Sequence, residues 1–250
     1  MLPAGCSMGI SRIEFREPQE TRYCSRNNLN RRRLLRPGYF PLLLIIAFWP
    51  APAAAQVEVQ GFLGSSVSVP TPLSITQVGQ PNIHFTAHWS TRTFKDTWYY
   101  AGRLGFWKGN RGWFLDFTHH KLYLENPPPE VQRFRITNGM NMFTVSRAFR
   151  RGKFSYAFGA GPVITYPRNI VRGQRLDETR GFWDGYYLSG GNLMATATRR
   201  FPLVAGAFLS LDGRASFSYV RVPVVDGHAS VPNFALHFHA GLGFSTEGLH

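Results

Sequence analysis

The densest group of side chains able to do chemistry lies in the segment Trp-Phe-Leu-Asp-Phe-Thr-His-His-Lys-Leu-Tyr, residues 113–123. It brings together a carboxylate, two imidazoles and an ammonium group, from Asp116 through His119 and His120 to Lys121. Such groups can transfer protons, bind a metal ion or bind phosphate. On a strand, the period of two places Asp116 and His120 on one face and His119 and Lys121 on the other. His119 and His120 therefore cannot ligate one ion if the strand is regular.

The other histidines do not offer a better metal site. His84 and His88 share a face of a strand but lie about 13 Å apart at about 3.3 Å per residue, too far for a common ion. A metal site would need residues of neighbouring strands, such as Asp116 or His120 with a His or Glu of an adjacent segment. In the simpler interpretation, inward polar residues fill a barrel with hydrogen bonds, while His119 and Lys121 touch phosphate in the headgroup zone.

The elements that must position these residues are strands, because apolar residues alternate with small or polar ones from Gln56 to Phe244. The pattern is clearest where Phe154, Tyr156 and Phe158 alternate with Ser, Ala and Gly. A soluble sandwich would bury such an aromatic face, whereas an outer-membrane barrel shows it to lipid. The sequence therefore predicts an all-β fold, an antiparallel transmembrane β-barrel over residues 56–250.

Turn signals divide this region into nine candidate strands, at roughly 57–68, 82–92, 98–107, 113–124, 136–149, 154–166, 186–199, 206–222 and 233–244. Bacterial barrels have an even number of strands, with short periplasmic turns and long extracellular loops. The connections expected to be long are 125–135, 167–185 and 223–232. On this assignment the stretch 69–97 is extracellular, where 82–92 adds strand structure or extends a wall. We predict eight spanning strands, with ten as the alternative.

An eight-stranded barrel has an interior just wide enough for side chains, which disfavours a diffusion channel. Aromatic residues flank two of the predicted strands, as the girdles of a membrane barrel do. As anchors in the interface they need no further role. They are Trp98, Tyr99, Tyr100, Trp107, Trp113 and Tyr123.

The first 55 residues have the order of a leader. A basic stretch that includes Arg31–Arg33 precedes the apolar run 41–49 and the small residues 51–55, which predicts a signal peptide cleaved between Ala55 and Gln56. Residues 1–30 fit a start codon assigned too far upstream. The apolar run is too short for a spanning helix. Both cysteines, Cys6 and Cys24, lie in the leader, so the mature chain would have no disulfide.

The mature chain is basic. Removing eight Arg and three Glu of the leader from the 28 basic and 14 acidic residues leaves 20 and 11, a net charge of +9. The basic residues are scattered through turns and loops, and export makes nucleic acid an improbable partner. Outer-membrane lipid and the phosphates of lipopolysaccharide are the expected partners. The residues expected to bind lipopolysaccharide are Arg168, Arg172, Arg175 and Arg180 of the long loop.

A further partner is the barrel assembly machinery, whose aromatic signal we place at Phe244, displaced from the terminus by Ser245–His250. A Gly-x-Ser-x-Gly elbow, a phosphate loop, a paired-cysteine site and a dinucleotide fingerprint are all missing from the sequence.

Several segments, in the same order, resemble the lipid A oxidase-like outer-membrane barrels. They are Trp98–Arg103, Asp116–Tyr123, Asn138–Asn141 and Gly159–Gly161, followed by Pro167. The resemblance covers most of the mature chain, and its most specific part is the Phe-Thr-His-x-Lys stretch from Phe117 to Lys121. The glycine motifs are less specific, and the Arg-rich loop and the displaced C-terminus depart from the family pattern.

The resemblance implies oxidation of the proximal glucosamine of dephosphorylated lipid A to an aminogluconate unit, with oxygen and a divalent metal. It would place His119 and Lys121, with Asp116 and His120, as catalytic residues at the level of the lipid headgroups.

Three other functions stay open on the sequence. One is a barrel with only a structural, adhesive or envelope-maintenance role. Another is an acyl-chain hydrolase of lipid A, which requires a serine with a histidine base at the membrane-facing surface. The last is a secreted ligand-binding barrel like a lipocalin, whose apolar face would point inward.

Overall fold

The computed structural model describes residues 56–93 and 98–246. The predicted leader, residues 1–55, lies outside this part of the chain. Within it, none of the elements is a helix long and apolar enough to cross a membrane.

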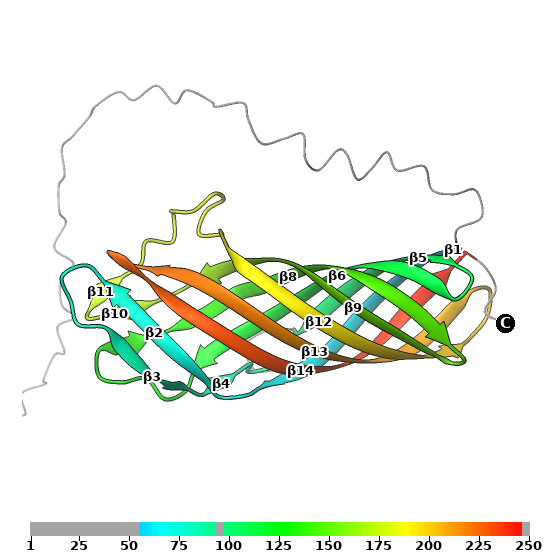
Figure 1. Cartoon of the computed structure of the whole chain (residues 1–250), viewed down its shortest axis with the longest axis horizontal. Helices are drawn as coiled ribbons and strands as arrows, with labels where there is room; N and C mark the ends of the chain where they lie inside the picture. Colours follow the sequence, from blue (N-terminus) through cyan, green and yellow to red (C-terminus); the bar gives the residue numbers. More distant parts are fainter. Residues whose placement is uncertain (1–55, 94–97, 247–250) are drawn as a thin grey trace, which may run out of the picture. The chain divides into compact units, whose positions relative to one another are not determined.

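Eight long antiparallel strands form a closed ring (Figure 1). Consecutive neighbours are hydrogen-bonded, and the last strand pairs with the first from Glu58↔Ser245 to Ser68↔Ala235. The prediction of eight spanning strands is confirmed, and the ten-stranded alternative is wrong. The strands are, in ring order, β1 (Gln56–Ser68), β5 (Tyr100–Lys108), β6 (Arg111–Leu124), β8 (Arg135–Arg151), β9 (Phe154–Pro167), β12 (Tyr187–Pro202), β13 (Ala207–Val224) and β14 (Gly227–Ser245).

The outer face of the ring is apolar. On β14, Phe238 and Leu242 are each 62% exposed, whereas His237 and His239 on either side of Phe238 are buried. The same alternation exposes Tyr156 and Phe158 on β9. A closed ring that exposes aromatic rings is the architecture of a transmembrane barrel, since all backbone groups are paired within it. The lipocalin-like alternative, with an inward apolar face, is therefore wrong.

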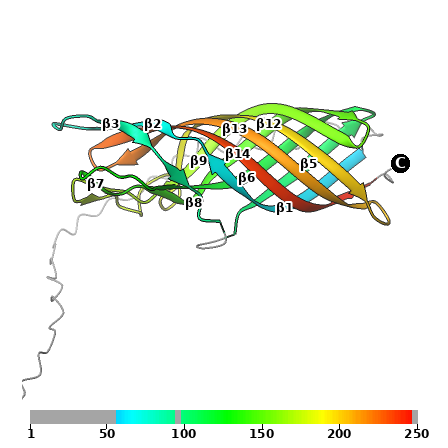
Figure 2. The ribbon, with the colours of Figure 1, turned by 90° about the horizontal axis from the view of Figure 1, so that it is seen from below.

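Six short strands build the end of the barrel that carries the long connections, which is the extracellular end of such barrels. Figure 2 labels β2, β3 and β7 at this end. The hairpin of β2 and β3 continues the wall where β1 ends, because β2 pairs with residues 227–230 of β14. The prediction that 82–92 extends a wall is confirmed, while β2 was not expected. The short strands are β2 (Thr71–Gln77), β3 (Ile83–Ala87), β4 (Trp89–Ser90), β7 (Val131–Arg133), β10 (Ile170–Val171) and β11 (Gln174–Arg175).

The expected long loop at 223–232 is wrong. Strands β13 and β14 stay paired up to Val224↔Gly227, with a tight turn at Asp226, whose φ is 54°. The two prolines misled the prediction, because proline lacks the N–H that a central strand needs. Pro223 lies beyond the last residue of β13 that pairs with β12, Val220. Pro232 lies between the parts of β14 that pair with β1 and β2, so neither neighbouring ladder requires a donor there.

The lower part of the barrel interior is filled by ion pairs. Near the periplasmic end, Glu58 accepts hydrogen bonds from Trp107 at 3.0 Å, Arg150 at 2.7 Å and Arg200 at 2.9 Å. This layer joins β1 to its neighbour β5 and to the more distant strands β8 and β12.

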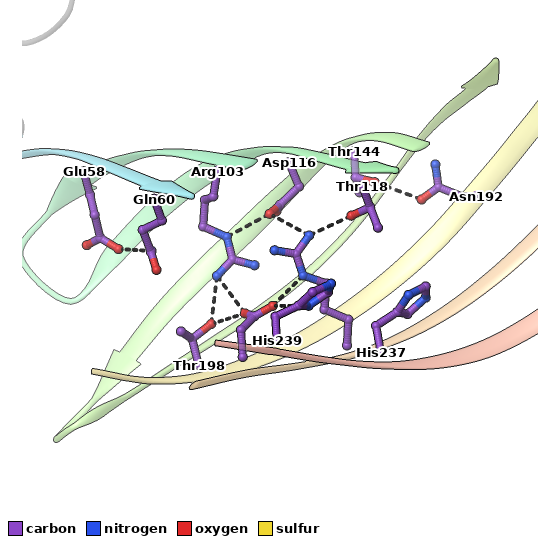
Figure 3. Close-up of polar contacts among 12 residues, drawn as sticks. Glu58, Gln60, Arg103, Asp116, Thr118, Thr144, Asn192, Thr198, His237 and His239 are labelled. Carbon is purple, nitrogen blue, oxygen red and sulfur yellow. Dashed lines mark hydrogen bonds and ion pairs between the residues drawn. The ribbon is translucent and has the colours of Figure 1, made fainter. Parts of the chain in front are cut away.

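A charge quartet, defined as Arg103, Asp116, Asp212 and Arg214, follows that layer along the barrel interior. Figure 3 labels Glu58 of the layer and Arg103 and Asp116 of the quartet. Arg103 contacts Asp116 at 2.8 Å and Asp212 at 3.1 Å, and Arg214 contacts the same two carboxylates at 3.4 Å and 2.5 Å. All four side chains have no exposed surface. The quartet crosses the barrel from β5 and β6 to β13.

Beyond the quartet, a layer of one tyrosine and two histidines precedes the apolar part of the interior. The Tyr99 hydroxyl contacts His237 Nδ1 at 2.5 Å and His120 Nδ1 at 3.2 Å. Further up, a buried apolar cluster fills the extracellular end, including Leu73, Ile75, Leu122, Ile136 and Met140. The filled interior agrees with the expectation that this barrel is not a diffusion channel.

We predict that Arg103→Met destabilises the barrel by about 3–5 kcal/mol, because it leaves a buried carboxylate without one of its partners. The measurement is the urea midpoint of unfolding in detergent micelles. Arg221→Met, which removes an exposed arginine of β13, is the matched control and is expected to change stability by no more than about 0.5 kcal/mol. Equal midpoints for the two variants would contradict this role of the quartet.

Candidate functional site

The candidate site lies where the outward face of β6 changes from apolar to polar. Trp113, Leu115 and Phe117 face outward along the strand and are followed by His119 and Lys121. Both polar side chains are buried, at 8% and 4% exposure, because neighbouring strands and loops cover them. The Tyr100 ring of β5 stacks on His119 with centroids 4.7 Å apart.

A bulge between β6 and β8 makes room for Lys121. The ladder runs from His120↔Met140 to Leu122↔Ile136, so Lys121 alone on β6 faces residues 137–139 of β8. Gly139 has a φ of 108°, which disfavours an L side chain. A Cβ there would lie 2.6 Å from the His119 ring and 2.2 Å from Asn141 Oδ1. Glycine at this position therefore allows the backbone to pass close to His119.

Asn141 orients His119. Asn141 Oδ1 lies 2.7 Å from His119 Nδ1, while Asn141 Nδ2 donates to the Asn138 carbonyl at 3.5 Å. Because the amide nitrogen is used by Asn138, the oxygen faces the histidine and accepts from Nδ1–H. This assignment leaves the lone pair on His119 Nε2, the arrangement of a general base.

A cavity of about 330 Å³ opens beside these residues, within the range of about 300–1,000 Å³ usual for small-molecule sites. Burial raises the pKa of Tyr186, with smaller contributions from Tyr166 and Tyr100, so its phenol stays neutral at physiological pH. The cavity thus combines aromatic rings, an ammonium group and an imidazole. Its lining residues are Trp98, Tyr100, His119, Lys121, Thr137, Asn138 and Tyr186.

The structure does not bring the four predicted catalytic residues together. His119 and Lys121 line the cavity on the outer wall. Asp116 and His120 point into the barrel, where Asp116 belongs to the charge quartet and His120 contacts Ser66 at 3.2 Å. The period of two anticipated this separation, and the wall of the barrel lies between the two pairs.

Three contacts between serine and histidine occur among the described residues, and all lie inside the barrel. Ser66 and Ser68 contact Nδ1 and Nε2 of His120 at 3.2 Å and 3.5 Å, and Ser216 contacts His237 Nε2 at 2.7 Å. Ser66, Ser216 and both histidines are buried, and Ser68 is half-buried. None of these contacts reaches the membrane-facing surface that an acyl-chain hydrolase would use.

The four arginines expected to bind lipopolysaccharide have different surroundings. Arg168 and Arg175 each contact Glu178 at 3.2 Å. Arg172 donates to Gln77 and to the Pro81 carbonyl, both at 2.7 Å, and so ties the loop to the turn between β2 and β3. The fourth, Arg180, is 79% exposed and lies 3.7 Å from Asp177.

The cavity residues do not fit a resident divalent metal ion. Among residues 56–93 and 98–246, His, Cys, Asp and Glu side chains do not gather in any group of three able to hold a metal. In the cavity lining His119 is the one residue of these types, and the ammonium of Lys121 beside it opposes a cation.

Several residues of the site were missed from the sequence. Trp98 and Tyr100 were interpreted as girdle anchors, and the Asn138–Asn141 motif carried no assigned role beyond the resemblance. Tyr186 joins the cavity from a loop far along the chain. The available signal was an outward aromatic residue on β5, Tyr100, next to an outward histidine on β6, His119. Recognising that the two are neighbours required the register between the strands.

No protein family model and no curated protein matches the chain. Solved structures with a similar fold include Neisserial surface protein A (9% identity, 76% of this chain, 96% of that one, TM-score 0.36). Another is Ail, the attachment invasion locus protein of Yersinia pestis (12% identity, 76% of this chain, 98% of that one, TM-score 0.35). A third is OprG from Pseudomonas aeruginosa (10% identity, 76% of this chain, 96% of that one, TM-score 0.41). Values this low carry no argument about this chain. Its assignment as an outer-membrane β-barrel follows from the closed ring and apolar outer face.

We predict that Gly139→Ala displaces His119, because the added methyl group would overlap its ring. The expected cost is about 1–3 kcal/mol in unfolding free energy, with a changed imidazole ¹⁵N shift for His119. Gly152→Ala is the matched control, since Gly152 also has a positive φ, 58°, but nothing within 4 Å of its added Cβ. An unchanged His119 signal in Gly139→Ala would contradict the close approach described above.

Proposed function

We propose that this barrel binds the sugar headgroup of lipopolysaccharide in the outer-wall cavity and oxidises the proximal glucosamine of lipid A there. The observation that carries the proposal is the position of the cavity. It opens on the lipid-facing side of the wall, where the apolar surface of β6 gives way to His119 and Lys121. A lipid held in the outer leaflet could enter it sideways without leaving the membrane.

The lining suits an anionic glycolipid. Trp98, Tyr100 and Tyr186 offer aromatic faces and edges against which the apolar side of a sugar ring can pack. Asn138 and Thr137 offer polar atoms for sugar hydroxyls. Lys121 adds a positive charge beside His119, which favours a phosphate or carboxylate group.

The oxidation would remove two electrons from C1 of the reducing-end hemiacetal and give the lactone. Dioxygen, the oxidant implied by the family resemblance, would accept these electrons with the C1 hydrogen and the hydroxyl proton and leave as hydrogen peroxide. Water would then open the lactone to the acid, which adds one oxygen atom overall. We assign His119 Nε2 to accept the proton of the C1 hydroxyl, because Asn141 occupies Nδ1. We assign Lys121 to stabilise the carboxylate that forms.

A second candidate is a barrel that binds lipopolysaccharide without chemistry, in a structural or adhesive role. The side chains that line the cavity favour this second candidate, because they do not fit the metal ion that the oxidase resemblance implies. The two candidates share the cavity and differ only in whether the bound lipid changes.

We expect lipid A from aerobically grown cells that carry the gene to gain about one oxygen on its diglucosamine backbone, as measured by mass spectrometry. His119→Ala and Lys121→Ala should abolish the shift. The controls are His84→Ala and Lys108→Ala, which alter exposed residues of the same types away from the cavity. An unchanged lipid A profile with wild-type protein in the outer membrane would sink the oxidase and leave the binding-only barrel.

A further inference from the structure

A small extracellular sheet gathers arginine side chains beside the cavity. In the sheet of β7, β10 and β11, Ile170 lies opposite Arg133 on one side and Arg175 on the other. Cross-strand neighbours share a face, so the two guanidinium groups flank one isoleucine. The long loop thus brings a residue of β11 next to one of β7, more than forty positions earlier in the chain.

Two more arginines join them. The backbone N–H of Arg168 donates to the carbonyl of Arg135 at 2.8 Å, which places these residues side by side. Glu178 lies among the guanidinium groups and contacts Arg168 and Arg175. We call Arg133, Arg135, Arg168 and Arg175 the arginine cluster. With Glu178 it has a surplus of positive charge.

Two further properties show that the cluster is short of acceptors. Partial burial lowers the pKa of Arg133, and the positive charges of Arg135, Arg175 and Arg168 lower it further, while Glu178 acts in the opposite direction. The Nε atoms of Arg133 and Arg135 are buried and have no hydrogen-bond partner among the described residues. Four like charges held close together destabilise a protein unless an anion compensates them.

Aromatic rings connect the cluster to the cavity. The Tyr166 hydroxyl donates to Glu178 at 3.4 Å, and the Arg168 guanidinium lies 5.3 Å from the centre of the Tyr166 ring. Tyr166 packs edge-on against Tyr186, with centroids 5.0 Å apart, and Tyr186 lines the cavity. Arg135 also precedes the cavity residue Thr137 by two positions on β8. One pair of tyrosines therefore separates the two sites.

We infer that the arginine cluster is a phosphate site, which binds the phosphate at one end of a glycolipid whose other sugar occupies the cavity. The inference rests on the proposed function. Guanidinium groups bind phosphate oxygens in a bidentate manner, and a convergent set of them is suited to a phosphate monoester. Glu178 acts as the internal counter-ion that the phosphate displaces from Arg168 and Arg175. A substrate lacking phosphate on the proximal sugar but keeping it on the distal one would satisfy both sites.

The test uses the full-length protein in phosphatidylcholine vesicles and measures binding of monophosphorylated and fully dephosphorylated lipid A. Wild-type protein should prefer the phosphorylated lipid. Arg133→Gln and Arg175→Gln should each weaken its binding by about tenfold or more, the usual effect of losing a charge-assisted hydrogen bond. Arg133→Lys, which keeps the charge, should recover part of the loss and shows that the variant folds.

Two further variants make the test specific. Glu178→Gln should strengthen binding of the phosphorylated lipid, because the competing carboxylate charge is gone. Arg221→Gln removes an exposed arginine of β13 that belongs neither to the cluster nor to the cavity, and it should change binding less than twofold. Equal losses for Arg221→Gln and Arg133→Gln, or equal binding of the two lipids by the wild type, would overturn the site. Competition by millimolar inorganic phosphate would show that the phosphate group alone is recognised, and lack of competition that the phosphate must be lipid-borne.

The outcomes also separate this site from the proposed oxidation. Phosphate-dependent binding without any gain of oxygen on lipid A would retain the arginine cluster and remove the oxidase. A gain of oxygen on lipid A, together with binding that the cluster variants do not change, would retain the oxidase and remove the phosphate site.

Discussion

The pairing of β1 with β14 is the interaction on which the rest of the structure depends. Lipid offers no hydrogen-bond partners, so a sheet in the membrane must have no free edge. The two strands pair over eleven residues each, and β14 then continues past the end of β1 to pair with β2. The pairing of β14 with β2 extends the wall beyond the end of β1, and β3 then pairs with β2 at the extracellular end.

Closure with only eight strands determines where function can lie. The interior is narrow, and the Glu58 layer, the charge quartet and the apolar cluster fill it. Charged residues inside are needed to satisfy one another, because an unpaired buried charge is strongly unfavourable. Asp116 and His120 are thus part of the interior, and the residues of this segment that line the outer-wall cavity are His119 and Lys121.

Local pattern predicted the spanning strands and the faces of β6, because side-chain direction on a strand depends only on the period of two. It failed where tertiary context decides. Pro223 and Pro232 appeared to end strands, yet both sit where the neighbouring ladder needs no donor. The cavity required the register of β5 on β6, the bulge opposite Lys121 and a distant loop that supplies Tyr186. Likewise, Arg133 could be added to the arginine cluster only once β7 was paired with β10, and Arg135 only once its carbonyl was found to accept from the Arg168 N–H.

Photo-crosslinking in living cells is the most direct test that the outer-wall cavity holds a lipopolysaccharide headgroup. A benzoylphenylalanine is placed at Tyr186, which lines the cavity, and at Tyr219, an outward tyrosine of β13 that does not. We expect a strong lipopolysaccharide adduct from position 186 and a weak one from position 219. Equal adducts from the two positions, or none from 186, would contradict binding of the headgroup in the cavity.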